Sequence, residues 1–569
     1  MSAPSETGFD IRSIPFSRRG SWLDISPVVA LHDVRDDLHL VSHQTGMHAI
    51  FTLEPLQGGE RVPVDVDAAP GRLRLAGAGG EIEIVFENDT TLRLRGRMLD
   101  LRLADAAAAL TPFTGTYLFH DPIDGSAVFT SYETGRRYRI TTLRGTATVA
   151  GAELLGSGER AVTIGGDEWE VAIEEFETAR APFTGTLSFD EAARAVALDF
   201  DDYVDRVAPW RSERTPGAVA AAYVLWSATV SARGFLTREA ILMSKHWMDK
   251  VWSWDHCFNA LALSPGLPRE AIDQFSVVFD FQDAAGALPD SVTHSEVLYN
   301  FVKPPIHGWA FRKLRQSLAE PLSRDVVAEL YGSLVRWTRF WLDSRRAPGH
   351  PLAHYQHGND SGWDNSTTFD NDRLIESPDL AAFLVVQFDV LAELADELGL
   401  AGDADEWRAE LRSMRGALLE LWDADTFVAR AVTTGRRSTT TSLLTTLPIV
   451  AAAHLPAEVS HLLAERISLH LTEFGPATQL VDTPEYEADG YWRGPIWAPS
   501  TALVEDGLRQ AGETGLADLI SARFRALCER SGFAENFDAL TGEGLRDRAY
   551  TWTASCYLTL AREAEERRG

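Results

Sequence analysis

The spacing of hydrophobic residues changes near residue 205, and this change constrains the fold more than any other feature of the chain. Before that point, short stretches alternate apolar and polar residues between turns that contain glycine. The clearest are EIEIVFEN (81–88), TLRLRGRMLDLRLAD (91–105), RRYRITTLRGTATVAG (136–151), EWEVAIEEF (168–176) and AVALDFDDY (195–203). Alternation with a period of two buries one face of each strand. The pattern therefore predicts an N-terminal antiparallel β-sandwich domain over residues 1–204.

Beyond residue 205 the hydrophobic residues recur at intervals of three and four over helical lengths. The segments 217–234, 324–346, 377–400 and 403–425 show this pattern, with Ser377 before Pro378 and Asp403 as candidate caps. A chain of 569 residues also exceeds the roughly 250–300 residues that one core can bury. We therefore expect a second, mainly helical domain over residues 205–569.

The charge balance excludes two classes of partner. The chain carries 83 acidic and 53 basic residues, a formal net charge of -30, which repels phosphate backbones and anionic lipid surfaces. The N-terminal segment MSAPSETGFDIRSIPFSRRG lacks the apolar run of a secretory signal, and no later run reaches the roughly 18 apolar residues of a membrane span. We expect a cytoplasmic protein that binds neither nucleic acid nor membrane. The sequence does not indicate an oligomeric state.

The cysteine and histidine spacings favour neither a disulfide nor a metal site. Cys257, Cys528 and Cys556 fit no disulfide framework and no zinc pattern, so we expect buried free thiols. His246 and His256 lack the paired spacing of metal ligands. We therefore expect no metal and no cofactor.

The connections between the predicted helices are rich in tryptophan, carboxylates and glycine. They include HWMDKVWSWDHCFN (246–259), HGNDSGWDNSTTFD (357–370), DTPEYEADGYWRGPIWAPS (482–500) and SGFAENFDALTGEG (531–544). Alternation of helices with such loops is typical of paired helices in a ring, with the long loops collected at one rim. Indole rings pack against the C–H faces of a sugar, while carboxylates and amides bind its hydroxyls. The loops therefore predict a small carbohydrate substrate.

Several of these strings resemble the loops of α/α-toroid glycoside hydrolases, most closely glycoside hydrolase family 63. The strings are SGWDNS, WSWDHCF, KPPIHGWA, YWRGPIWAPS and ENFDALTGEG, and they occur in the same order as in the family, over roughly residues 210–565. Trehalases of family 37 share a similar SGWD loop and are more distant. The resemblance implies an all-α (α/α)6 barrel, an inverting mechanism and α-glycosidic substrates.

The resemblance also implies a catalytic pair. The aspartate of SGWDNS is Asp364 and corresponds to the general acid, and the glutamate of ENFDALTG is Glu535 and corresponds to the general base. Inversion requires two carboxyl groups roughly 6.5–9.5 Å apart, which leaves room for the attacking water. We expect Asp364, beside Trp363, to be partly desolvated and protonated, and Glu535 to be ionised and more open to water.

Further residues of the same strings are predicted to bind substrate. These are Trp254, Asp255, Lys303, His307, Trp309, Trp363, Asn365, Arg493, Trp497 and Trp552. Gly362 would allow a close backbone approach beside the acid. One position departs from the family: relatives often carry glutamate where this chain has Asp360, so the contribution of that position is open.

These observations favour an exo-acting, inverting α-glycoside hydrolase, with an α-glucosidase as the first reading. An alternative is a hydrolase of glucosylglycerate or mannosylglycerate, whose carboxylate would favour cationic or hydroxyl partners. Two other classes stay open: a sugar isomerase or epimerase on the same barrel, which would use histidine pairs, and a carbohydrate-binding protein without a catalytic pair.

Overall fold

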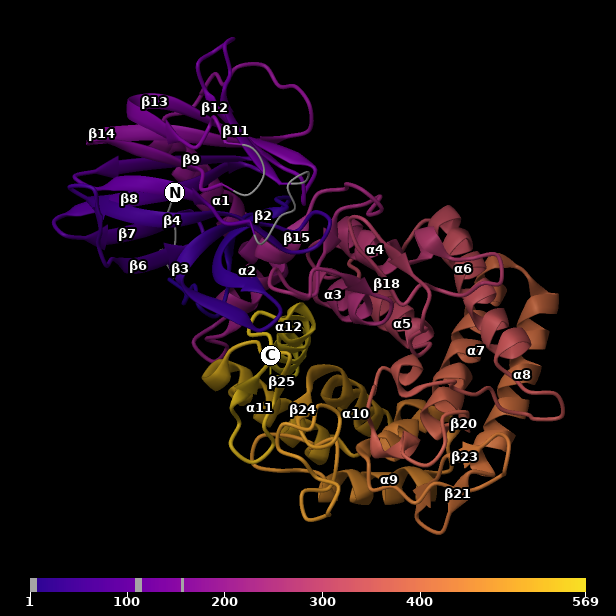
Figure 1. Cartoon of the computed structure of the whole chain (residues 1–569). Helices are drawn as coiled ribbons and strands as arrows, with labels where there is room; N and C mark the ends of the chain where they lie inside the picture. Colours follow the sequence, from indigo (N-terminus) through magenta and orange to yellow (C-terminus); the bar gives the residue numbers. More distant parts are fainter. Residues whose placement is uncertain (1–7, 108–114, 155–157, 569) are drawn as a thin grey trace. The chain divides into compact units, whose positions relative to one another are not determined.

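The computed structural model describes residues 8–107, 115–154 and 158–568 and contains two compact units (Figure 1). The first unit comprises Met1–Arg206, Ala222–Asp249 and Thr293–Glu296. The second comprises Val207–Ala221, Lys250–Val292 and Val297–Gly569. The chain thus leaves the first unit near residue 206 and returns to it twice.

The first unit is built on one large antiparallel sheet, which confirms the expected N-terminal β domain. Its strands are β1 (Phe16–Ser17), β2 (Leu23–Ala30), β3 (Asp33–Ser42), β4 (His48–Gln57), β5 (Glu60–Arg61), β6 (Asp65–Ala69), β7 (Arg72–Gly77), β8 (Gly80–Asn88), β9 (Thr91–Arg97), β10 (Asp100–Asp105), β11 (Thr116–His120), β12 (Ala127–Ser131), β13 (Arg136–Ala150) and β14 (Ala161–Phe176). The hydrogen-bonded order is β1-β2-β3-β4-β10-β14-β9-β8-β7-β6, with β11–β13 attached through β14 and β5 through β4.

Strands from the two ends of this sheet share one hydrophobic core. Leu23 of β2 and Leu40 of β3 belong to the same buried cluster as Leu75 of β7 and Ile84 of β8. Strands this far apart in the order can share a core only if the sheet curves back over itself, as Figure 1 shows. The inward side chains alternate with outward polar ones, as the period of two predicts.

The prediction of a strand at 195–203 is wrong, because this segment lies within helix α1 (Phe189–Val207). Its buried side chains include Val196, Phe200, Tyr203 and Val207, which recur every three or four residues. The run AVALDF fits a period of two over six residues, and only the longer window shows the helical period.

The second unit is a ring of paired helices. Its helices are α3 (Asp255–Leu263), α4 (Pro268–Ser276), α5 (His307–Ser317), α6 (Arg324–Ser344), α7 (Pro378–Leu398), α8 (Ala401–Leu419), η4 (Leu443–His454), α9 (Ala457–Leu469), α10 (Ala498–Gln510), α11 (Thr514–Ser531) and α12 (Thr551–Glu566), and α2 (Ala218–Ala228) precedes them. Contacts run from α3 to α5, α7, η4, α10 and α12, and then back to α3. The helices α4, α6, α8, α9 and α11 pack outside these (Figure 1).

Inner and outer helices alternate along the chain, and this order determines where the long loops meet. Each inner helix except the last, α12, is followed by an outer one, so the inner helices run in the same direction and the loops that precede them gather at one rim. Two short three-stranded sheets brace these loops. One consists of β17 (Val251–Trp252), β18 (Ser291–Val292) and β19 (Val297–Leu298), and the other of β24 (Ile496–Trp497), β25 (Asn536–Phe537) and β26 (Gly544–Leu545).

The helix ends follow local signals in part. Pro378 occupies the first turn of α7, and Gly399, at φ 76°, ends it in the left-handed conformation. Helix α8, however, begins at Ala401, and Asp403 instead accepts a hydrogen bond from the Tyr331 hydroxyl at 2.8 Å. Among the described residues no helix is both long and apolar enough to cross a membrane. Residues 1–7, on which the expected absence of a secretory leader partly depends, lie outside the described residues.

Candidate active site

Asp364 and Glu535 lie in two of the loops at this rim. Asp364 follows the short helical turn η2 (Gly358–Ser361), and Glu535 lies in the connection between α11 and β25. The Tyr491 hydroxyl hydrogen-bonds to Glu535, and burial raises the pKa of Tyr491, with further contributions from the carboxyl groups of Glu535 and Asp364. Both carboxyl groups therefore act on one tyrosine, although they are far apart in the sequence.

Glu535 is buried, in contrast to the expectation that it would be open to water. Its side chain is 1% exposed, and its Oε2 atom has no hydrogen-bond partner among the described residues. Burial and the nearby Asp547 raise the pKa of Glu535 to about 8, while Arg546 and the Tyr491 hydroxyl act against that shift. A buried acceptor without a partner is costly. It is therefore suited to hold a ligand or a water molecule.

Asp364 is the more exposed of the two carboxyl groups. It is partly exposed in the structure, and burial nonetheless raises its pKa. The Lys303 ammonium and His357 oppose this rise, and Asp290 adds to it. A raised pKa keeps a carboxyl group protonated closer to neutral pH, which a general acid needs.

Two glycines allow the backbone around Asp364 to pack closely. Gly362 has φ 73°, and a Cβ atom there would lie 2.6 Å from the Trp254 ring. A Cβ atom at Gly358 would lie 2.2 Å from the carbonyl oxygen of Asp364. The acid loop thus requires glycine at both positions. Both lack space for a Cβ atom, and Gly362 also has a left-handed backbone conformation.

Five tryptophans from three loops and the first turn of α12 form one cluster beside the two carboxyl groups. Trp492 and Trp497 stack with ring centroids 4.0 Å apart, and Trp363 lies 4.7 Å from Trp492. Trp552 meets Trp254 at 5.6 Å and Trp497 at 5.5 Å, both edge to face. All five are almost completely buried. The cluster forms a closely packed aromatic wall beside the carboxyl groups.

A buried charge network lies next to the wall. The Lys303 ammonium forms an ion pair with Asp290 at 2.8 Å and donates to the Asn359 carbonyl at 3.0 Å. Asp255 accepts a hydrogen bond from the Tyr550 hydroxyl at 3.3 Å, and its second oxygen has no partner among the described residues. Burial raises the pKa of Asp255 to about 8, although Lys303 and Tyr550 counteract this shift. Burial disfavours the ammonium form of Lys303, but Asp290, Asp364 and Asp255 outweigh burial and raise its pKa.

Asn365 and Arg493 join two of the loops. The Asn365 side chain donates to the Gly490 carbonyl at 3.0 Å and accepts from the Trp492 amide at 2.9 Å. Arg493 donates to the Asn365 carbonyl at 2.8 Å and forms an ion pair with Asp370. These contacts position the acid loop against the Tyr491–Trp492 segment.

The structure places His307 and Trp309 among the helices. Both lie in the first turn of α5, where the Trp337 indole donates to His307 Nδ1 at 3.1 Å. The Trp309 indole donates to Asp506 of α10 at 2.7 Å. The His307 contact therefore joins the inner helix α5 to the outer helix α6, and the Trp309 contact joins α5 to the inner helix α10.

His256, Cys257 and His307 form a buried cluster with ligand atoms within 4.8 Å of one another. His307 Nδ1 accepts a hydrogen bond from the Trp337 indole N–H, so the proton of the neutral His307 ring lies on Nε2. The Nε2 atom then has no free lone pair for a metal ion. His256 Nδ1 lies 3.1 Å from the Trp252 carbonyl and so carries its own proton. Burial lowers the pKa of both histidines, to about 4 for His256. The cluster is consistent with neutral, hydrogen-bonded side chains rather than with metal ligands.

Sequence reasoning missed four polar residues of this site: Asp290, Tyr491, Tyr550 and Arg546. Tyr491 lies in the quoted loop 482–500, whereas Asp290, Arg546 and Tyr550 lie outside the quoted loops, and none of the four carries a recognisable spacing. Tyr491 and Arg546 have positive φ values of 63° and 60°, and the Arg546 guanidinium lies 5.0 Å from the Tyr491 ring centre. Such strained backbone at two touching residues is typical of functional sites.

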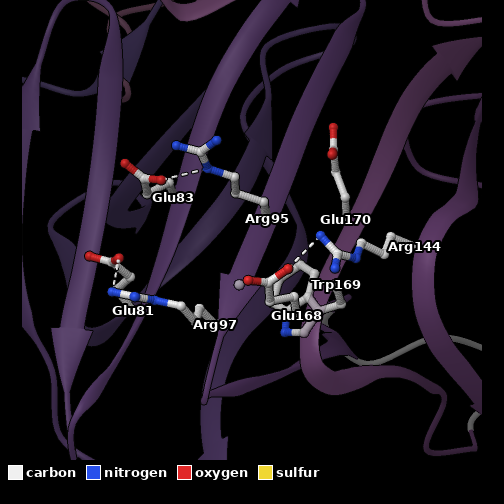
Figure 2. A pocket seen from close by; sticks show the side chains of 9 residues that line it. Glu81, Glu83, Arg95, Arg97, Arg144, Glu168, Trp169 and Glu170 are labelled. Atoms are coloured by element: carbon white, nitrogen blue, oxygen red, sulfur yellow. Dashed lines mark hydrogen bonds and ion pairs between the residues drawn. The ribbon is translucent and has the colours of Figure 1, made fainter. Parts of the chain in front are cut away.

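The first unit has a separate groove of about 370 Å³ on the outer face of its sheet (Figure 2). Arginines and glutamates line it in pairs: Arg95 with Glu83 at 2.6 Å, Arg97 with Glu81 at 2.9 Å, and Arg144 with Glu168. Trp169 lies beneath these pairs and is 1% exposed. Its carboxylates are neutralised by their partners, so the groove does not offer an acid and base pair.

Comparisons with known proteins identify the family of the chain. The sequence model of the family described as "Mannosylglycerate hydrolase MGH1-like glycoside hydrolase domain" matches residues 248–553. The mannosylglycerate hydrolase of Rubrobacter radiotolerans is 25% identical over 413 residues, which cover 55% of this chain and 90% of that protein. The glucosylglycerate hydrolase of Mycolicibacterium hassiacum is 22% identical over 428 residues, covering 57% of this chain and 94% of that protein.

Solved structures share the fold. The family 63 mannosylglycerate hydrolase from Thermus thermophilus in complex with glucose has a TM-score of 0.55 and 23% identity, covering 60% of this chain and 99% of that one. A bacterial glucoamylase in complex with acarbose has a TM-score of 0.60 and 10% identity, covering 100% of this chain and 96% of that one. The expected β domain followed by an α/α toroid is therefore confirmed, as is the resemblance. Because the family match covers more than half of the chain, the chain belongs to the mannosylglycerate hydrolase MGH1-like family and is a glycoside hydrolase of family 63.

Proposed function

We propose that this protein is an inverting, exo-acting hydrolase of α-linked glycosides of glycerate, with Asp364 as general acid and Glu535 as general base. The observation that carries the proposal is the pair of carboxyl groups with raised pKa values that act on Tyr491. In an inverting reaction the protonated acid serves the leaving oxygen, and the ionised base activates water on the opposite face of the sugar.

The glycerate preference rests on the relatives and on local charge. The similar proteins named above are hydrolases of mannosylglycerate and glucosylglycerate, so they support this alternative better than the first reading of an α-glucosidase. Lys303 and Arg546 act against the raised pKa values of Asp364 and Glu535, respectively, and Arg493 donates to the backbone carbonyl of Asn365, next to Asp364. Cationic partners of this kind suit the carboxylate of a glycerate leaving group. Membership of a hydrolase family also disfavours the alternative of a sugar isomerase or epimerase.

The aromatic wall and the network at Asp255 and Lys303 are assigned to the terminal sugar. Asp255 has one oxygen without a partner among the described residues, as a residue that grips sugar hydroxyls would. The wall supports an exo-acting site rather than an open cleft, because five bulky aromatic side chains gather there. Asn365 and Arg493 would position the acid loop rather than touch the sugar.

Proton NMR of a substrate panel tests this proposal. We expect hydrolysis of α-glucosylglycerate or α-mannosylglycerate at least about tenfold faster than hydrolysis of the matching glycerol conjugate, since an interaction with the carboxylate is lost in the latter; tenfold corresponds to about 1.4 kcal/mol. The first sugar to appear should be the β-anomer, because water attacks opposite the leaving group.

The glycerol conjugates are the matched controls, since sugar and linkage stay the same and only the carboxylate changes. Hydrolysis of maltose or trehalose that is faster than hydrolysis of the glycerate conjugates would instead support an α-glucosidase. Early appearance of the α-anomer would contradict inversion, and oligosaccharides released from a long α-glucan would contradict an exo-acting pocket.

Tyr491→Phe is expected to move the acidic limb of the pH profile to higher pH. The base must be ionised, so kcat/KM falls as pH drops below the pKa of Glu535, which is raised to about 8. The Tyr491 hydroxyl stabilises the carboxylate and lowers that pKa, so its removal raises the pKa further. The measurement is kcat/KM from about pH 5 to pH 10. Tyr486→Phe, in the same loop, is the control, and an acidic limb that stays in place in Tyr491→Phe would show that the hydroxyl does not act on the base.

A further inference from the structure

Asp360 lies where two loops of the site meet, and its carboxylate accepts three hydrogen bonds. Its Oδ1 atom accepts from the Val302 amide at 3.1 Å. Its Oδ2 atom accepts from the Gln356 amide at 2.8 Å and from the Arg345 guanidinium at 2.7 Å. The residue is 1% exposed, so water does not compete for these acceptors.

The residue before it makes a second connection between the same loops. The Asn359 carbonyl accepts from the Lys303 ammonium at 3.0 Å. Residues 359 and 360 thus hold the consecutive residues 302 and 303, one through a side chain and one through the backbone. This double connection fixes the loop that carries Lys303 against the turn η2 that leads to Asp364.

Arg345 ties this junction to a rigid element. It follows the last residue of the 21-residue helix α6. Its guanidinium lies 5.3 Å from the Phe340 ring and 5.9 Å from the Trp341 ring. The position of the junction is therefore set by the toroid itself, and not only by the loops.

We infer that Asp360 is a positioning residue that acts through Lys303 to place the acid Asp364. The inference rests on the proposed role of Asp364. Only a short stretch of chain connects the two carboxyl groups, and Gly358 packs against the Asp364 carbonyl, so a shift of the turn displaces the acid. This assigns a role to Asp360, whose contribution the sequence alone leaves open.

The positioning role predicts the direction in which the pH profile shifts when Asp360 is changed. Lys303 stabilises the Asp364 carboxylate and so lowers its pKa. If the junction loosens and the ammonium withdraws, the acid keeps its proton to higher pH. The alkaline limb of kcat/KM, which reports loss of that proton, then moves to higher pH.

The test compares Asp360→Asn with wild type, with Lys303→Met and with the double variant. We expect kcat to fall by about 10²-fold, the loss associated with a misplaced catalytic group, with a smaller change in KM. The alkaline limb should move to higher pH in both single variants, and the two shifts should not add in the double variant. Asp360→Glu, which keeps the carboxylate, should retain the position of the wild-type limb even if kcat falls.

Glu376→Gln is the matched control for stability. Glu376 is a fully buried carboxylate that binds Arg430 at 2.6 Å, and it makes no contact with Lys303 or Asp364 among those described. We expect the control to lose thermal stability alone. If Asp360→Asn also loses only thermal stability and keeps its kcat and pH profile, the positioning role is overturned. Additive limb shifts in the double variant would overturn the route through Lys303. Wild-type turnover in Asp364→Asn would instead overturn the proposed acid, and with it this inference.

Discussion

Asp364→Asn and Glu535→Gln should each lower hydrolysis by roughly 10²–10⁴-fold while the protein stays folded. Each substitution keeps the shape of the side chain and removes the proton transfer, which corresponds to about 3–5 kcal/mol of transition-state stabilisation. Both side chains have raised pKa values because of burial, so a neutral amide is better tolerated there than an ionised carboxylate. We therefore expect thermal stability to stay the same or to rise.

Steady-state kinetics, with circular dichroism as the check of folding, measure this expectation. The controls are Asp372→Asn and Glu543→Gln, which change carboxylates of the same two segments. Asp372 is held by the exposed Arg436, and Glu543 is exposed. Near-wild-type turnover in either catalytic variant would exclude that residue from the pair. An equal loss in the controls would point to disruption of the loops.

The β domain was predictable because its strands have one buried face, which imposes alternation along each strand. The helix α1 was not, because AVALDF satisfies the strand period locally while Val196, Phe200 and Tyr203 follow the helical one. The curvature that brings β2 and β8 around one core is a property of strand pairing between distant segments. No local pattern encodes it.

At the site, the sequence predicts which residues take part better than it predicts how buried they are and which groups surround them. Glu535 was expected to be open to water, yet it is buried, because Tyr491 from another loop, Asp547 from the same connection between α11 and α12, and Trp552 from the start of α12 surround it. Asp290 and Tyr550 had no distinguishing neighbours in the chain. Their importance arises only when the ring of helices brings them to Lys303 and Asp255.

Gly362→Ala should be the most damaging substitution of a residue that carries no functional group. Its φ of 73° costs an alanine about 1–2 kcal/mol, and the added Cβ atom would lie 2.6 Å from the Trp254 ring, so backbone or ring must move. Trp254 meets Trp492 and Trp552 and cannot yield without displacing them. Asp364 lies two residues away, and a displacement of about 1 Å can cost about 10²-fold in rate.

The comparison with Gly399→Ala separates strain from contact. Gly399 has nearly the same φ, 76°, but an added Cβ atom meets nothing within 4 Å. We expect both variants to show a lower apparent unfolding midpoint, and only Gly362→Ala to lose kcat and to change its tryptophan fluorescence, since five indoles form the cluster that it disturbs. Equal losses of stability with unchanged kcat in both variants would mean that the acid loop absorbs the methyl group. The tight packing of Gly362 on Trp254 would then not be what holds Asp364 in place.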